Sequence, residues 1–318
     1  MIRFLMLGLV AIAITVPGMA RAEKMNVLLD WFVNPVHAPL VIADAKGYFA
    51  EAELEIEIIP PADPSDPPKL VAAKRADVAI SYQPQLHMQI DQGLPLVRIG
   101  TLVGTPLNIM VTLADSGIES IADLKGKRIG YSVGGVEEAL VQAMLEHAGL
   151  TLSDVEMINV NFSLSPSLLA GQVDAVTGAF RNFELNQMDL EGHPGRAFFI
   201  EESGVPVYDE LIFVAHQERR DDPQLATFIQ AVERGIHYMI NHPAESWEIF
   251  TAAYPALDDE LNRRAWRDTL PRFDLRPAAL DADRYRRFAQ FMADKALIEA
   301  VVPVEQYAVV PGAPAATE

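Results

Sequence analysis

Strand-like and helix-like patterns alternate along the chain from about position 24. Short apolar or alternating runs predict strands at 24–30, 54–59, 76–81 and 96–102. The stretches between them predict helices at 37–50, from about 68 onward and at 84–93. Because strands that alternate with helices are typical of parallel sheets, this part of the chain predicts an α/β fold.

A second series of the same kind follows a strand at 108–113. Its strands are predicted at 128–131, 155–160 and 174–178, and its helices at 136–147 and 166–170. A return strand is predicted at 211–216. Further helices are predicted after it, at 223–241, 243–253, 258–270 and 281–297. Two series with a return strand predict two lobes joined by paired chain crossings. We expect a first lobe at 23–106 plus 215–310, a second at 107–214, a ligand cleft between them and a disordered tail at 311–318.

The first 22 residues have the pattern of a secretory signal peptide. Arg3 precedes an apolar run, and Ala20-Arg21-Ala22 matches a cleavage site, so the mature chain is expected to begin at Glu23. No cysteine follows the apolar run, which argues against a lipoprotein, and the 318 residues contain none. Cys-dependent catalysis and thiolate metal sites are therefore excluded, and we expect a protein free in the periplasm of a Gram-negative bacterium.

The chain is strongly acidic. Its formal charge is −19, and loss of Arg3 and Arg21 with the signal peptide changes it to −21. Nucleic-acid binding requires the opposite sign, so nucleic acid is excluded as a partner. The histidines show no metal-ligand spacing, and we expect neither a metal nor a cofactor.

The segment from Asp30 to His37 gathers the most informative side chains. It follows a buried run and is turned by Pro35, so Trp31, Asn34 and His37 are expected on a loop at a strand end. Ligands bind at such ends in open α/β sheets. One stacking face with several hydrogen-bonding groups and no cation suits a neutral, flat heteroaromatic ring. The alternatives are a core position for Trp31, a turn role for Asn34 and a helix cap for His37.

The same segment carries a family resemblance. Asp-Trp-Phe-x-Asn-Pro-x-His at 30–37, followed by Lys46-Gly47-Tyr48-Phe49, resembles the opening of the ThiY-type periplasmic binding proteins. These belong to a wider thiamine-pyrimidine family that includes the yeast pyrimidine synthases, and the resemblance covers roughly residues 25–215. It implies the type II periplasmic binding protein fold. It also implies a monomer that binds a pyrimidine precursor such as a formylaminopyrimidine and docks on an ABC permease of the inner membrane.

Tyr82 and His87 follow the strand predicted at 76–81. Tyr82 can form the other side of an aromatic clamp around the ligand, or pack at the rim of the lobe. His87 lies one turn beyond Gln83 on the same face of the next helix. The resemblance implies a lysine in the yeast synthases at the position of Gln83, a histidine at that of His87, and a cysteine-rich iron-binding element absent here. These departures remove the synthase chemistry that needs the lysine.

Two further stretches offer polar groups at strand ends. Between a strand and a helix start, the backbone amides of Gly134 and Gly135 are expected to bind a carbonyl oxygen or a hydroxyl, unless they only begin the helix. Glu184 follows the strand at 174–178. The resemblance implies that a glutamate in this region binds the aminopyrimidine; a protonated carboxyl can also donate to a ring nitrogen. The alternative is a solvated helix residue.

Other ligands and other classes of function compete with this interpretation. Riboflavin or a sulfonate such as taurine is the alternative ligand, and a sulfonate needs a basic residue near the cleft, for which Arg181 is the candidate. A pyrimidine synthase-like enzyme is the alternative class, opposed by Gln83, the absent cysteines and the signal peptide. A periplasmic sensor module is a third class of function.

Overall fold

The computed structural model describes residues 23–313, so residues 1–22, for which a signal peptide is predicted, and residues 314–318 lie outside the described part. Its first sheet has the strand order β2-β1-β3-β10-β4. The strands are β1 (Glu23–Leu28), β2 (Leu54–Ile59), β3 (Val78–Ser81), β4 (Leu96–Val103) and β10 (Leu211–His216). β1 runs parallel to β2 and β3, whereas β10 is antiparallel to β3 and β4. We call the body built on this sheet lobe 1.

The second sheet has the order β7-β6-β8-β5-β9, and its body is called lobe 2. Its strands are β5 (Asn108–Leu113), β6 (Arg128–Tyr131), β7 (Glu156–Asn159), β8 (Ala175–Phe180) and β9 (Gly195–Phe199). β6 is parallel to β7 and β8, and β5 is antiparallel to β8 and β9. β9 was not predicted, because its five residues are all half-buried and show no alternation.

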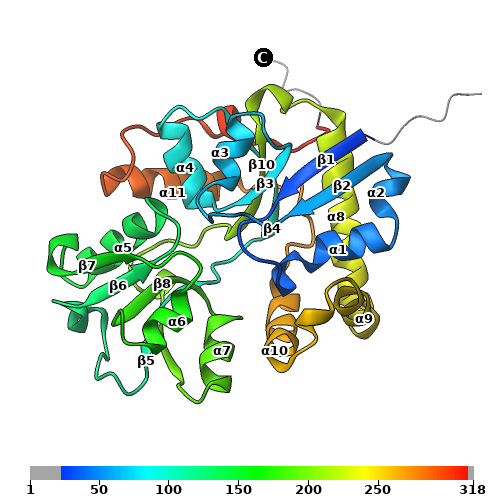
Figure 1. Cartoon of the computed structure of the whole chain (residues 1–318). Helices are drawn as coiled ribbons and strands as arrows, with labels where there is room; N and C mark the ends of the chain where they lie inside the picture. Colours follow the sequence, from blue (N-terminus) through cyan, green and yellow to red (C-terminus); the bar gives the residue numbers. More distant parts are fainter. Residues whose placement is uncertain (1–22, 314–318) are drawn as a thin grey trace, which may run out of the picture.

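Helices cover the two sheets, and the chain after β10, which belongs to lobe 1, is mainly helical (Figure 1). They are α1 (Ala38–Ala45), α2 (Tyr48–Glu51), α3 (Pro67–Ala72), α4 (Gln83–Asp91), α5 (Val136–His147), α6 (Leu164–Leu169), α7 (Glu184–Leu190), α8 (Pro223–Asn241), α9 (Pro243–Ala253), α10 (Glu260–Thr269), α11 (Ala282–Asp294) and α12 (Val304–Tyr307). The helix predicted at 37–50 is divided in two, because Gly47 adopts a left-handed φ of 74°. No helix within residues 23–313 is long and apolar enough to cross a membrane.

The chain passes between the lobes twice, from β4 to β5 and from β9 to β10. Arg284 of α11 ties the two passages together. Its Nη1 donates to the carbonyl oxygen of Gly104 at 2.7 Å and also to the carboxylate of Asp209. Glu210 continues this link, since its Oε2 accepts from the backbone amides of Leu107 and Asn108 at 2.6 and 2.8 Å. We call these two passages the hinge. The hinge is therefore stabilised by charge-assisted hydrogen bonds.

A second set of contacts joins the lobes away from the hinge, where α10 lies beside α7 (Figure 1). The amide nitrogen of Asn182 donates to the hydroxyl of Thr269 at 2.6 Å, and both side chains are buried. Two exposed hydrogen bonds lie next to it, Arg264 to Asp189 at 2.6 Å and Asn186 to Asp268 at 2.8 Å. We call this set the α7–α10 contact. It indicates that the structure has the lobes closed on one another.

Candidate functional site

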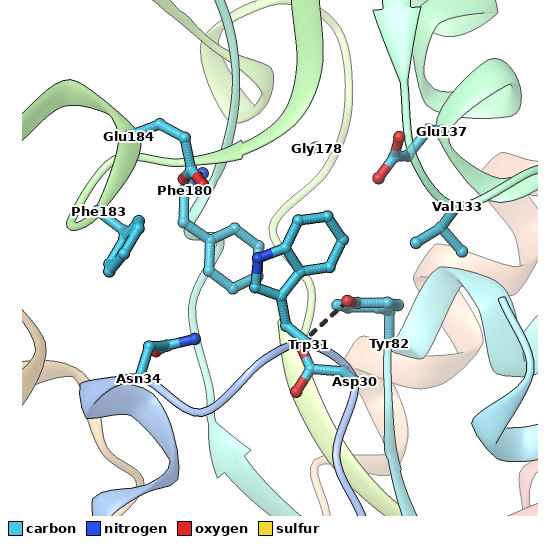
Figure 2. Close-up of a pocket in the computed structure, with 10 residues that line it drawn as sticks. All are labelled: Asp30, Trp31, Asn34, Tyr82, Val133, Glu137, Gly178, Phe180, Phe183 and Glu184. Atoms are coloured by element: carbon cyan, nitrogen blue, oxygen red, sulfur yellow. Dashed lines mark hydrogen bonds between the residues drawn. The ribbon is translucent and has the colours of Figure 1, made fainter. Parts of the chain in front are cut away.

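A cavity lies between the two lobes (Figure 2). Lobe 1 contributes Asp30, Trp31, Asn34 and Tyr82, which follow the C-terminal ends of β1 and β3. Lobe 2 contributes Val133, Glu137, Gly178, Phe180, Phe183 and Glu184, which follow β6, begin α5, or lie on and after β8. Both sheets thus direct their strand ends at the same space, as open α/β sheets do.

His37 orients Asp30 rather than lining the cavity. Its ring is fully buried, its Nδ1 accepts from the backbone amide of Asn34 at 3.2 Å, and its Nε2 lies 2.9 Å from Asp30 Oδ1. Because Nδ1 is the acceptor, the proton sits on Nε2 and is donated to Asp30. The other carboxylate oxygen of Asp30 accepts from the hydroxyl of Tyr82 at 3.0 Å. The structure therefore joins four of the predicted residues in one buried network.

Trp31 reaches across from lobe 1 to lobe 2. Its indole is half-buried and meets the ring of Phe162 edge-on, with centroids 4.6 Å apart. The neighbouring Phe32 packs against Phe183 of lobe 2 at 5.8 Å. Figure 2 places the indole in the middle of the cavity view, with Glu184 and Glu137 on its two sides. Trp31 is thus not a core residue of lobe 1, and its position suits a stacking role.

Glu184 is the first residue of α7 and is only 6% exposed. Its Oε2 accepts from the backbone amide of Phe180 at 2.6 Å, which points the carboxyl back toward the cavity. Burial raises the pKa of Glu184 to about 7. At neutral pH the carboxyl therefore exists in both forms, one able to accept only and one able also to donate. The alternative of a solvated helix residue does not hold.

Glu137 is a second buried carboxyl that the sequence did not single out. It lies in the first turn of α5, is 6% exposed, and accepts from the backbone amide of Ser132 at 2.7 Å through Oε2. Burial raises the pKa of Glu137 to about 8. The one available signal was an acid in the first turn of a helix that follows a buried strand. That signal is common in ordinary helices.

Gly134 and Gly135 do not line the cavity. The amide of Gly134 donates to Ser65 Oγ at 3.4 Å, and that of Gly135 donates to the carboxylate of Glu138 at 2.6 Å. The glycines begin α5, and the amide of Gly135 is used by the chain itself. The expectation that both amides face a ligand is thus not met in this structure.

A second cavity adjoins the first and shares Tyr82, Glu137, Gly178 and Phe180 with it. Its remaining lining includes Tyr208 and Glu210 from the hinge. Burial raises the pKa of Glu210 to about 7. We call this second space the inner chamber. Neither Tyr208 nor Glu210 was predicted, because the chain between β9 and β10 shows no periodic pattern.

His87 lies outside both cavities. It packs against Phe288 and Tyr307, with ring centroids 5.8 and 5.4 Å away, and is hydrogen-bonded to Gln83 at 3.2 Å. Burial lowers the pKa of His87 to about 3, so the ring stays neutral. The structure corrects its predicted place at the site, because α4 turns this face into the core of lobe 1.

Arg181 does not supply a cation to either cavity. Its guanidinium forms a two-pronged ion pair with Glu201, both distances being 2.8 Å. No Lys or Arg is among the residues that line the cavity or the inner chamber. Within residues 23–313 no group of three or more His, Asp or Glu side chains is placed to hold a metal.

Gly178 allows β8 to pass close to Glu137. Its φ is 82°, and a Cβ added there would lie 2.1 Å from Glu137 Oε1. We expect Gly178→Ala to lower the free energy of unfolding by about 2 kcal/mol through backbone strain and overpacking. Gly149→Ala is the matched control, because Gly149 has a φ of 79° and open space around it. Thermal denaturation showing equal losses for the two variants would refute the steric role of Gly178.

Sequence comparisons give this chain several relatives. The model of the family described as NMT1/THI5 like matches residues 34–246. A putative thiamine biosynthesis protein of Haemophilus influenzae is 52% identical over 297 residues, covering 93% of this chain and 94% of the relative. The formylaminopyrimidine-binding protein of Halalkalibacterium halodurans is 35% identical over 229 residues, covering 71% and 69%. The 4-amino-5-hydroxymethyl-2-methylpyrimidine phosphate synthase of Legionella pneumophila is 27% identical, covering 82% and 83%.

Comparison with solved structures identifies the fold. The alkanesulfonate-binding protein SsuA of Xanthomonas axonopodis pv. citri, solved with MOPS, superimposes with a TM-score of 0.72. The match covers 91% of this chain and 99% of the other at 16% identity. A Candida albicans protein described as having the generic periplasmic binding protein fold matches with a TM-score of 0.70 at 17% identity. The predicted α/β periplasmic binding protein fold is confirmed.

Proposed function

We propose that this chain, which belongs to the NMT1/THI5-like family, is a periplasmic binding protein for a formylaminopyrimidine-like precursor of thiamine. One observation carries the proposal: a cavity between the lobes presents Trp31 for stacking and the buried carboxyl of Glu184 for hydrogen bonding, with no basic residue in its lining. Binding requires no chemical step from the protein.

The proposed contacts follow from the groups that the ligand offers. An aminopyrimidine ring presents a flat π face, an exocyclic amine that donates and ring nitrogens that accept. Glu184 accepts from the amine and, in its protonated form, donates to the adjacent ring nitrogen. Asn34 has its side-chain oxygen taken by the backbone amide of Val36, so its role is to hold the loop that carries Trp31. Tyr82 and Asp30 close the opposite side of the cavity.

An enzymatic role is the competing proposal, since several relatives are named as pyrimidine phosphate synthases. The family resemblance implies a lysine in the yeast synthases at the position of Gln83. In this chain Gln83 Oε1 accepts from the backbone amide of Asp209 at 2.8 Å. Gln83 thus stabilises the hinge of lobe 1 and lines neither cavity. This use of the side chain favours a binding protein over a synthase.

A sulfonate ligand is disfavoured by the same lining. A buried sulfonate needs a cation or several free donors, and the cavity offers carboxyls instead. Secretion to the periplasm and delivery of the ligand to an ABC permease complete the proposal. They are supported by the signal-like sequence at 1–22 and by the structural similarity to periplasmic binding proteins.

Native mass spectrometry of protein purified from the periplasm tests the proposal directly. We expect a co-purified small molecule whose mass matches a formylaminopyrimidine. Calorimetry with that compound should show a one-to-one complex, and taurine and riboflavin under the same conditions should show no heat of binding. A complex with taurine or riboflavin, or product formation on incubation without any other protein, would reject it.

A further inference from the structure

The loop between β6 and α5 has the form of an anion site, but the chain fills it with its own carboxylates. Loops that lead from a strand into a helix expose backbone amides that bind phosphate readily. Here the amide of Ser132 donates to Glu137 at 2.7 Å and the amide of Gly135 donates to Glu138 at 2.6 Å. The carboxyl of Glu137 is buried and lines the cavity, whereas the bond between Gly135 and Glu138 lies at the exposed start of α5. The amide of Ser132 is therefore the one that a bound phosphate would use, and it is occupied.

The walls beside this loop are lined by acidic side chains. Glu137 and Glu210 line the inner chamber, and Asp30 and Glu184 line the adjoining cavity. No Lys or Arg among the lining residues offsets them. The two carboxyls of the inner chamber also affect each other, since the charge of Glu210 contributes to raising the pKa of Glu137 after the larger effect of burial. A phosphate in this space would be buried without a counter-ion.

We infer that the site selects a pyrimidine without a phosphate group, and that Glu137 determines this specificity by lining the site with a carboxyl and by occupying the amide of Ser132, which would otherwise bind the phosphate. The inference rests on the proposed function and adds to it the form of the ligand that the site accepts. The group attached to the ring then lies toward the inner chamber as a neutral hydroxyl or amide. Glu137 is the contact residue in this arrangement.

Calorimetry with two probes tests the inference: 4-amino-5-hydroxymethyl-2-methylpyrimidine and its phosphate ester. We expect the wild-type protein to bind the alcohol at least 100-fold more tightly than the ester. Glu137→Ala frees the amide of Ser132 and removes the carboxyl, so its affinity for the ester should rise at least tenfold, with no rise for the alcohol. Glu137→Gln removes the charge but keeps an acceptor for that amide, and its gain should be smaller.

The control is Glu119→Ala, an exposed acid of lobe 2 outside the cavity lining, which should leave the ratio of the two affinities unchanged. If the alanine variant does not fold, the glutamine variant decides, and it must still bind the ester at least threefold more tightly than wild type. The inference is overturned, with the proposed function intact, if wild type binds both probes within threefold or if neither variant gains affinity for the ester. Binding of neither probe nor of a formylaminopyrimidine would instead reject the proposed function.

A pH series separates charge from steric exclusion. Above about pH 7 the phosphate ester is already fully ionised, because its second pKa is about 6. The pKa of Glu137 is raised to about 8 by burial, so its carboxyl gains charge between about pH 7 and 9. The affinity of wild type for the ester relative to the alcohol should fall at least threefold over that interval. A ratio that does not change with pH would contradict a role for the charge of Glu137.

Discussion

Trp31→Ala is expected to weaken the binding of an aminopyrimidine by about 100-fold, which corresponds to ~2.8 kcal/mol. Two losses add up in this variant. The ligand loses a stacking surface, worth roughly 1 kcal/mol beyond the buried area. The closed state also loses the packing of the indole of lobe 1 on Phe162 of lobe 2. Isothermal titration calorimetry of the variant and the wild type measures the effect.

Trp31→Phe serves as the matched control for that experiment. A phenyl ring keeps an aromatic face toward the ligand and toward Phe162, so the expected loss is roughly tenfold or less. Equal affinity of the alanine variant and the wild type would show that the ring does not stack on Trp31. Thermal denaturation of both variants without ligand must show that they are folded.

Glu184→Ala is the second substitution with a large expected effect. It leaves the exocyclic amine of the ligand without a partner in a buried place, which costs about 1–3 kcal/mol, or a factor of roughly 5 to 150 in affinity. The same substitution should matter far less for an analogue that lacks the amine. A cycle of protein change against ligand change isolates the interaction. Additive effects in that cycle would mean that Glu184 does not contact the amine.

The pH dependence of binding gives an independent check on Glu184. Burial raises the pKa of its carboxyl to about 7, so below that pH the protonated group can both accept from the amine and donate to the ring nitrogen. Above pH 7 the free protein must take up a proton to form the same complex, and affinity should fall by up to tenfold per pH unit. Glu184→Gln keeps a donor and an acceptor without titrating. The Glu184→Gln variant should lose less affinity than Glu184→Ala, and its affinity should no longer show the pH dependence that Glu184 causes. Calorimetry between about pH 6 and 9 measures both effects.

The sequence was informative where a residue's place follows from local pattern. The loop after β1 is set by a buried strand and by Pro35, and these two features put Asp30 and Trp31 at the strand end in the structure as well. Glu184 was reached by the same reasoning from β8 together with the family resemblance. In each case the chain direction of a parallel strand determines which end meets the other lobe.

Residues whose position depends on tertiary packing could not be predicted from the sequence. Glu137 and Glu138 are both acids in the first turn of one helix, and only the fold shows that one faces the cavity while the other caps the helix. His87 and Gln83 occupy the same helical face, but that face is turned into lobe 1 by the packing of α11 and α12. Periodicity predicts that a face is shared and does not say what covers it.

Helix α7 contributes both to the cavity and to the α7–α10 contact. Its first residue, Glu184, faces the cavity, while Asn186 and Asp189 contact α10 of lobe 1. The lobes cannot part without breaking the buried hydrogen bond between Asn182 and Thr269. The dwell time of a bound molecule is therefore governed partly by side chains that never touch it. Substitutions on α10 would speed or slow unloading while leaving recognition unchanged.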